Sequence, residues 1–159
     1  MQQPLFLTGE GNILIKRNCT FGYLNGGFNF GGSINIDVRS EKSEVIINEN
    51  VFFNNNVNIS SCNFIEIGKN TLVGQNVNIM DYDAHGINPN MRNKIGKIGS
   101  IKIGNNVWIG TNVIILKNTV IGDNCIIAAG AVVSGFYQEN LIIGGVPSKI
   151  IKTIQFEKS

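Results

Sequence analysis

The chain has 159 residues, a length that suits a single domain. Apolar residues make up 43 % of it and charged residues 15 %, a composition that provides side chains for a core and excludes a disordered chain. A formal net charge of +2 is too small to indicate a nucleic-acid partner.

Residues 1–17 show no basic start followed by an apolar run, so we expect no signal peptide. No segment approaches the roughly 18 apolar residues of a membrane span. The three cysteines have no paired spacing, which indicates buried thiols in a reducing compartment, and we expect a cytoplasmic protein. Because residues 18–36 read as short strands and glycine turns that cannot be phased, we interpret residues 1–44 as irregular coils.

A six-residue pattern follows from about residue 45. The hexads FNNNVN, IGKNTL and VGQNVN begin at residues 53, 67 and 73, with a two-residue slip near Ile65. From residue 103 the chain reads IGNNVW, IGTNVI, ILKNTV, IGDNCI and IAAGAV. The first position is large and the fifth is small or β-branched, so we predict that both point into a core.

The fourth position of each hexad is Asn or Gly, the residues that most easily adopt a left-handed backbone. The pattern therefore predicts one sharp corner per hexad, at Asn56, Asn70, Asn76, Asn106, Asn112, Asn118, Asn124 and Gly130. Short strands joined by regular corners make a coil that stacks on itself, which indicates an all-β parallel helix. The strands of a β-sandwich would not keep a six-residue phase for so long.

The hexads stop between Ile79 and Ile103, and we interpret residues 80–102 as a loop extruded from one coil. A long loop on a rigid scaffold usually carries function. This one contains the only histidine of the chain, His85, preceded by Asp81 and Asp83 in the pattern D-x-D-x-H. A nearby carboxylate can orient an imidazole and favour its protonated form, as a general base requires.

The hexads, the loop sequence MDYDAHGI, the segment IGNNVWIGTNVIIL and the ending IIGGVPSKIIK together resemble the hexapeptide-repeat acyltransferases over about residues 45–154. The similarity is greatest to the galactoside, maltose and polysaccharide O-acetyltransferases. The resemblance implies a left-handed parallel β-helix of triangular section, with residues 1–154 as one domain and 155–159 as a tail. It also implies a homotrimer with active sites between subunits.

The same resemblance implies acetyl-coenzyme A as the donor, a saccharide acceptor, surface polysaccharide biosynthesis as the setting, and no metal. His85 matches a general base that deprotonates the acceptor hydroxyl, which attacks the thioester directly, while a backbone N–H stabilises the oxyanion. Positions matching acceptor contacts are Asp83, Asn54 and Trp108. Positions matching coenzyme A contacts are Thr111, Ala129, Ser134, Lys149 and Lys152.

Residues 1–44 lack the helical segment of many sugar acetyltransferases, which favours the polysaccharide-modifying relatives. Two alternatives share the fold and donor: an N-acetyltransferase of a nucleotide-linked amino sugar, and a streptogramin-type antibiotic acetyltransferase with a similar Y-x-D-x-H stretch. A zinc hydratase of the same fold needs several histidine ligands, and the chain has one. A non-enzymatic scaffold is disfavoured because His85 and the terminal lysines are in place.

Overall fold

The structure is a computed structural model that describes residues 3–25 and 31–155. Its strands form three sheets, which we call A, B and C. Sheet A contains, in spatial order, β1 (Leu5–Gly9), β4 (Ile34–Val38), β7 (Asn58–Ser61), β10 (Asn78–Met80), β13 (Ile114–Leu116) and β16 (Val132–Val133). Sheet B contains β2 (Asn12–Ile15), β5 (Glu44–Ile47), β8 (Phe64–Ile67), β11 (Ser100–Ile103), β14 (Thr119–Ile121) and β17 (Phe136–Tyr137).

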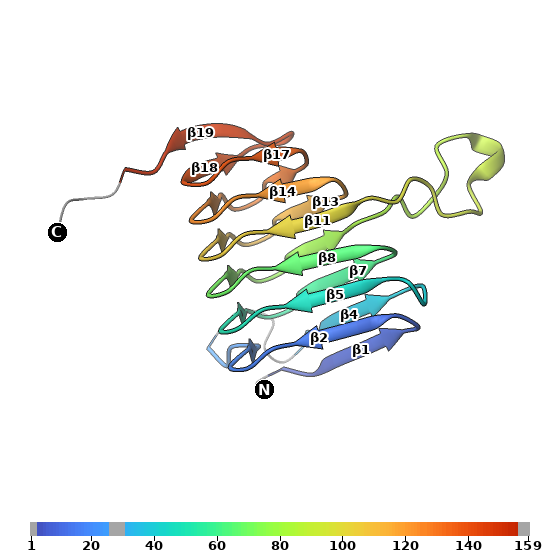
Figure 1. The fold of residues 1–159 in the computed structure, drawn as a ribbon, viewed down its shortest axis with the longest axis horizontal. Helices are drawn as coiled ribbons and strands as arrows, with labels where there is room; N and C mark the ends of the chain where they lie inside the picture. The colour runs from blue at the N-terminus through green and yellow to red at the C-terminus, as the bar shows by residue number, and fades with distance from the viewer. Residues whose placement is uncertain (1–2, 26–30, 156–159) are drawn as a thin grey trace.

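Sheet C contains β3 (Thr20–Phe21), β6 (Phe52–Phe53), β9 (Leu72–Val73), β12 (Trp108–Ile109), β15 (Ile126–Ile127), β18 (Leu141–Gly144) and β19 (Lys149–Thr153). Consecutive strands lie in different sheets, and each strand up to β15 pairs in parallel with the third strand after it. The chain therefore winds as a left-handed parallel β-helix, one coil for every three strands (Figure 1). Among the strands that the structure describes, only β19 is antiparallel to its neighbour, β18.

The core is formed by the hexad positions that the sequence predicts to point inward. The large residues of the first position are buried: Ile103, Ile109, Ile115, Ile121, Ile127 and Val133. The smaller residues of the fifth position are buried as well: Val107, Val113, Thr119, Cys125 and Ala131. Strand alternation places the intervening side chains on the outer surface.

The corners also lie where the sequence predicts them. Asn56, Asn70, Asn76, Asn106, Asn112, Asn118 and Asn124 have φ between 54° and 61°, and Gly130 has φ 73°. The asparagines do more than tolerate this conformation, because their amides bond from coil to coil. Asn56 Nδ2 donates to Asn76 Oδ1 (2.9 Å), and Asn76 Nδ2 donates to Asn112 Oδ1 (2.6 Å). These ladders explain why Asn is used more often than Gly.

Replacing Asn112 with valine is expected to destabilise the protein by about 1–3 kcal/mol, because a β-branched residue resists positive φ and the bond from Asn76 is lost. Thermal unfolding measures the effect as a lower Tm. Asn112→Gly is the matched control, since it loses the bond but keeps the backbone conformation. A Tm of Asn112→Val equal to the wild-type value would show that this corner carries no strain.

The N-terminal coils are more regular than the sequence predicts. Strands β1 and β4 pair in register from Leu5–Ile34 to Gly9–Val38, and Ile34, Ile36 and Val38 are buried. These strands have five residues each and do not keep the six-residue phase, although β4 alternates buried with half-buried side chains. The predicted tail at 156–159 lies outside the described residues, and the domain limits 1–154 stay a prediction.

The loop occupies residues 81–99 and is shorter than the predicted 80–102, because Met80 belongs to β10 and residues 100–102 belong to β11. Ile101 is buried in the core, so the helix resumes before Ile103. The loop contains the 3₁₀ turn η1 (Pro89–Met91) and projects away from the coils (Figure 1). Within residues 3–25 and 31–155, no helix is long and apolar enough to cross a membrane.

Candidate active site

The loop starts from a buried carboxylate. Asp81 has no exposed surface, and its Oδ2 accepts hydrogen bonds from Ser61 Oγ (2.6 Å) and the Phe64 N–H (2.8 Å). Its carboxylate also accepts the N–H groups of Cys62 (2.7 Å) and Asn63 (3.1 Å). These donors form the corner between β7 and β8, where the hexad pattern slips by two residues. Asp81 therefore fixes the root of the loop to the preceding coil.

Beyond this root the two arms of the loop pair with each other. The Asp83 N–H donates to the Lys97 carbonyl (2.8 Å), and the Gly96 N–H donates back to the Asp83 carbonyl (2.8 Å). Further out, the Gly86 N–H donates to the Lys94 carbonyl (2.9 Å). The loop is thus a hydrogen-bonded ribbon rather than a structureless segment, and it can present a side chain at a defined position.

His85 is exposed, and its ring is oriented by one backbone contact. Nδ1 lies 2.6 Å from the Arg92 carbonyl oxygen. Because a carbonyl can only accept, Nδ1 must carry the proton, and in the neutral ring Nε2 is then the unprotonated nitrogen. A neutral imidazole that is held through Nδ1 and has Nε2 unprotonated is the arrangement that a general base requires.

Asp83 points to a different partner from the one we expect. Its carboxylate pairs with Lys117 Nζ (Oδ1–Nζ 2.5 Å), a residue at the corner between β13 and β14. The predicted orienting contact of Asp83 to His85 is replaced by the Arg92 carbonyl. Contact of Asp83 with an acceptor stays a prediction.

Asn54 and Trp108 come together on the outer face of sheet C. They line a depression of about 370 Å³ with Phe52, Leu72, Val73 and Gly74. The indole is 55 % exposed. Strand register stacks five outward side chains of this face in one line, which we call the apolar column: Phe52, Leu72, Trp108, Ile126 and Ile142.

The five residues predicted to contact coenzyme A do not share one location in a single chain. Thr111 and Ala129 lie in successive coils at the corner between sheets C and A, where the Gly130 N–H donates to the Thr111 carbonyl (2.9 Å). Lys152 lines a cavity of about 580 Å³ beneath β19, which the upper end of the apolar column also lines. Lys149 is exposed on β19, and Ser134 is exposed at the corner between sheets A and B.

The predicted site residues therefore fall into two groups on different sides of the triangular helix. The loop group, at the corner between sheets A and B, is His85, Asp83 and Ser134. The sheet C group, on that sheet or at its corner with sheet A, is Asn54, Trp108, Thr111, Ala129, Lys149 and Lys152.

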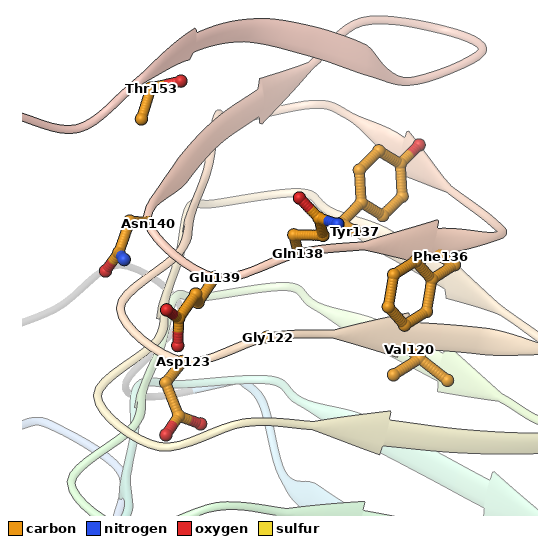
Figure 2. A pocket seen from close by; sticks show the side chains of 9 residues that line it. All are labelled: Val120, Gly122, Asp123, Phe136, Tyr137, Gln138, Glu139, Asn140 and Thr153. Carbon is orange, nitrogen blue, oxygen red and sulfur yellow. The ribbon is translucent and has the colours of Figure 1, made fainter.

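A larger cavity, of about 700 Å³, lies at the C-terminal end of sheet B and contains none of these residues. Figure 2 shows the Asp123 and Glu139 carboxylates at its corner side and Phe136 further along the sheet. Asp123 Oδ1 accepts the Asn105 N–H at 2.7 Å, a contact that joins two coils. Because His85 and its loop lie elsewhere, we do not take this cavity as the candidate active site.

The cysteines are poorly suited to carry an acyl group. Burial raises the pKa of Cys125, and burial followed by the charge of Asp81 raises the pKa of Cys62. The pKa of Cys19 is also raised, mainly by burial. Raised values keep the thiols protonated and weakly nucleophilic.

The sequence reasoning missed two partners, Lys117 and the Arg92 carbonyl. A signal for Lys117 was present, because Ile79 and Ile115 occupy the same hexad position and are register partners. Lys117 follows Ile115 by two residues and so lies one coil above the root of the loop. Nothing in the pattern of the loop indicated the carbonyl that orients His85.

Comparison with known proteins agrees with the fold. Residues 100–135 match the bacterial transferase hexapeptide (six repeats) family. The chain is 34 % identical over 166 residues to Escherichia coli K12 WbbJ, named as a lipopolysaccharide biosynthesis O-acetyl transferase, with 97 % of this chain and 78 % of that protein aligned.

Two solved structures are similar as well. Galactoside acetyltransferase in complex with coenzyme A has a TM-score of 0.67 at 35 % identity, over 70 % of this chain and 56 % of that one. A maltose O-acetyltransferase from Clostridium difficile 630 has a TM-score of 0.65 at 29 % identity, over 93 % and 69 %. The chain thus spans about half the length of the galactoside enzyme. With a relative 34 % identical along nearly its whole length, the chain belongs to the hexapeptide-repeat acetyltransferases, a family of acyltransferase enzymes.

Proposed function

We propose that the protein transfers an acetyl group from acetyl-coenzyme A to a saccharide hydroxyl in surface polysaccharide biosynthesis, with His85 as general base. The observation that supports this proposal is the bond from His85 Nδ1 to the Arg92 carbonyl, which makes Nε2 the unprotonated nitrogen in the neutral ring. The saccharide is supported by the names of relatives, above all the lipopolysaccharide transferase at 34 % identity. We place the reaction in the cytoplasm, which suits three free cysteines.

The residues present fit a coenzyme A thioester, which supplies the acetyl group in activated form. The upper part of the apolar column, from Trp108 to Ile142, offers an apolar surface for the pantetheine chain. Lys152, at the end of this surface, and Lys149 offer cations to phosphate groups. Thr111 and Ala129 lie at the neighbouring corner, where backbone groups can bind the pantetheine amides.

The chemistry that this chain supplies is proton transfer and positioning. His85 Nε2 would take the proton of the acceptor hydroxyl as its oxygen attacks the thioester carbonyl. The C–S bond then breaks, and the imidazolium returns the proton to the departing coenzyme A thiolate, so no covalent intermediate on the enzyme is needed. Asp83, Asn54 and Trp108 hold the acceptor in this reaction.

A homotrimer unites the two residue groups. The loop group and the sheet C group face different sides of one chain, but the loop of one copy can reach sheet C of the next. The apolar column supports such an interface as well, because Leu72 and Trp108 are exposed and the other three residues are partly exposed, and contiguous apolar surface commonly marks an interface. A repeated contact between unlike faces closes a ring of copies.

Titration of acetyl-coenzyme A, and separately of coenzyme A, into the wild-type protein tests the donor site by calorimetry. Both are expected to bind with micromolar Kd, about −8 kcal/mol. Lys152→Met is expected to weaken both several-fold through the lost phosphate contact, whereas Lys42→Met, an exposed lysine in an early coil, should bind as the wild type does. Absence of binding heat for both ligands would refute the proposal that acetyl-coenzyme A is the donor. Thiol release with a panel of saccharides and nucleotide-linked amino sugars then distinguishes O- from N-acetylation.

A further inference from the structure

An ion pair joins the loop to the body of the β-helix. Lys117 Nζ and Asp83 Oδ1 are in contact, with side chains only 24 % and 29 % exposed. The described residues contain two other ion pairs, and in each the cation is about half exposed: 49 % for Arg39 with Asp37, and 56 % for Lys69 with Glu49. A sheltered pair is less screened by water and salt than an exposed one.

The ion pair between Lys117 and Asp83 joins the loop to the coil above it. Leu116 is the register partner of Met80, so Lys117 stands on the coil immediately above the start of the loop. Asp83 is the residue at which the two loop arms bond to each other, through Lys97 and Gly96. The ion pair therefore holds both arms of the loop at one point, two residues before His85.

The other contacts between the loop and the β-helix lie nearer the root of the loop: Tyr82 Oη is 2.9 Å from Ser60 Oγ, and Asn63 Nδ2 donates to the Gly99 carbonyl (2.9 Å). The bond from His85 to Arg92 lies within the loop, so it sets the ring relative to the loop but not the loop relative to the β-helix. Asp81 fixes the root, two residues further from His85 than Asp83. A base must be held closely, because a displacement of about 1 Å can cost about 10²-fold in rate.

We propose that Lys117 is a positioning residue for acetyl transfer, acting through Asp83 to hold the loop so that His85 Nε2 stays at one place. The inference rests on the proposed role of His85. Lys117 also leaves Asp83 Oδ2 available, so the ion pair is compatible with an acceptor contact of Asp83.

The test uses Lys117→Met, which keeps the aliphatic length of the side chain and removes the charge. Lys117→Arg is the conservative variant, and Lys69→Met, which breaks the pair with Glu49 on another corner, is the matched control. Amide hydrogen exchange at Asp83 and Gly96 reports on the loop without any activity. Steady-state kinetics use acetyl-coenzyme A with methyl galactoside and maltose as acceptor probes.

Lys117→Met is expected to speed exchange at Asp83 and Gly96 about tenfold and to lower kcat by roughly 10- to 100-fold, with KM for acetyl-coenzyme A within about twofold. Lys117→Arg should bring both the exchange rates and kcat most of the way back to the wild-type values. A side chain that only filled space would not give this rescue. Lys69→Met should change neither. Adding Asp83→Asn to Lys117→Met should speed exchange no further, because the partner is already lost.

Unchanged exchange in Lys117→Met would overturn the inference whatever the activity, since the ion pair would then not hold the loop. Faster exchange with unchanged kcat would also overturn it, since the loop would be held without benefit to the reaction. A wild-type protein that acetylates neither probe nor any saccharide of the panel would refute the proposed function and with it the catalytic part of the inference. The exchange measurement then shows separately whether the ion pair was correctly identified.

Discussion

Replacing His85 with alanine is expected to lower kcat for acetyl transfer by about 10²–10⁴-fold, the usual contribution of a general base. The protein should stay folded, because His85 is exposed and the ring is held by a bond to the Arg92 carbonyl rather than by packing in the core. Thiol release gives the rate, and thermal unfolding together with sedimentation shows whether fold and assembly are retained.

The control for this variant is His85→Asn. An asparagine amide can donate to the Arg92 carbonyl from nearly the position of Nδ1, but it has no basic nitrogen. If His85 is the base, His85→Asn is as inactive as His85→Ala. If the ring serves only to hold the loop, the asparagine variant recovers most of the activity, and the general-base assignment is wrong. Near-wild-type activity of the alanine variant would contradict both roles.

The β-helix can be predicted from the sequence because every hexad repeats the same short pattern of residues. Each hexad carries its own corner residue and its own inward side chains, so Asn112 or Ile115 can be interpreted without knowing the rest of the chain. The pattern is weaker in the first coils, where five-residue strands such as β4 keep alternation but not the six-residue phase. There the coil is held by pairing between strands, and that pairing is not visible in a single hexad.

The candidate site was less predictable, because its contacts join residues far apart in the sequence. The histidine stood out as the only one of the chain, but its orienting partner is a backbone carbonyl, which leaves no signature in the sequence. Asp83 was singled out as a carboxylate two residues before His85, and its role at the site stays a prediction; its partner Lys117 lies 34 residues away. Lys117 can be recognised as the partner only once β10 and β13 are known to pair, which requires the loop between them to be treated as an insertion between stacked coils.

Asp81→Asn is the second substitution for which we expect a large effect, here on stability. The carboxylate accepts four hydrogen bonds in a site without exposed surface. An amide presents a single oxygen, and its NH₂ group would face backbone N–H donors that cannot accept a hydrogen bond. Buried donors left without an acceptor cost about 1–3 kcal/mol each, so we expect the free energy of unfolding to fall by about 2–4 kcal/mol, measured by urea denaturation.

Asp37→Asn is the matched control, because this carboxylate pairs with the half-exposed Arg39 on the surface of sheet A and should contribute at most about 1 kcal/mol. If Asp81 acts where the structure places it, hydrogen exchange in Asp81→Asn increases first at the N–H groups of Cys62 and Phe64, which lose their acceptor. Hydrogen exchange at Asp83 and Gly96 should increase as well, because Asp81 fixes the root of the loop to the preceding coil. A free energy of unfolding equal to that of Asp37→Asn would mean that the corner between β7 and β8 is stable without this carboxylate, and that the position of the loop depends on its other contacts, such as the ion pair of Asp83 with Lys117.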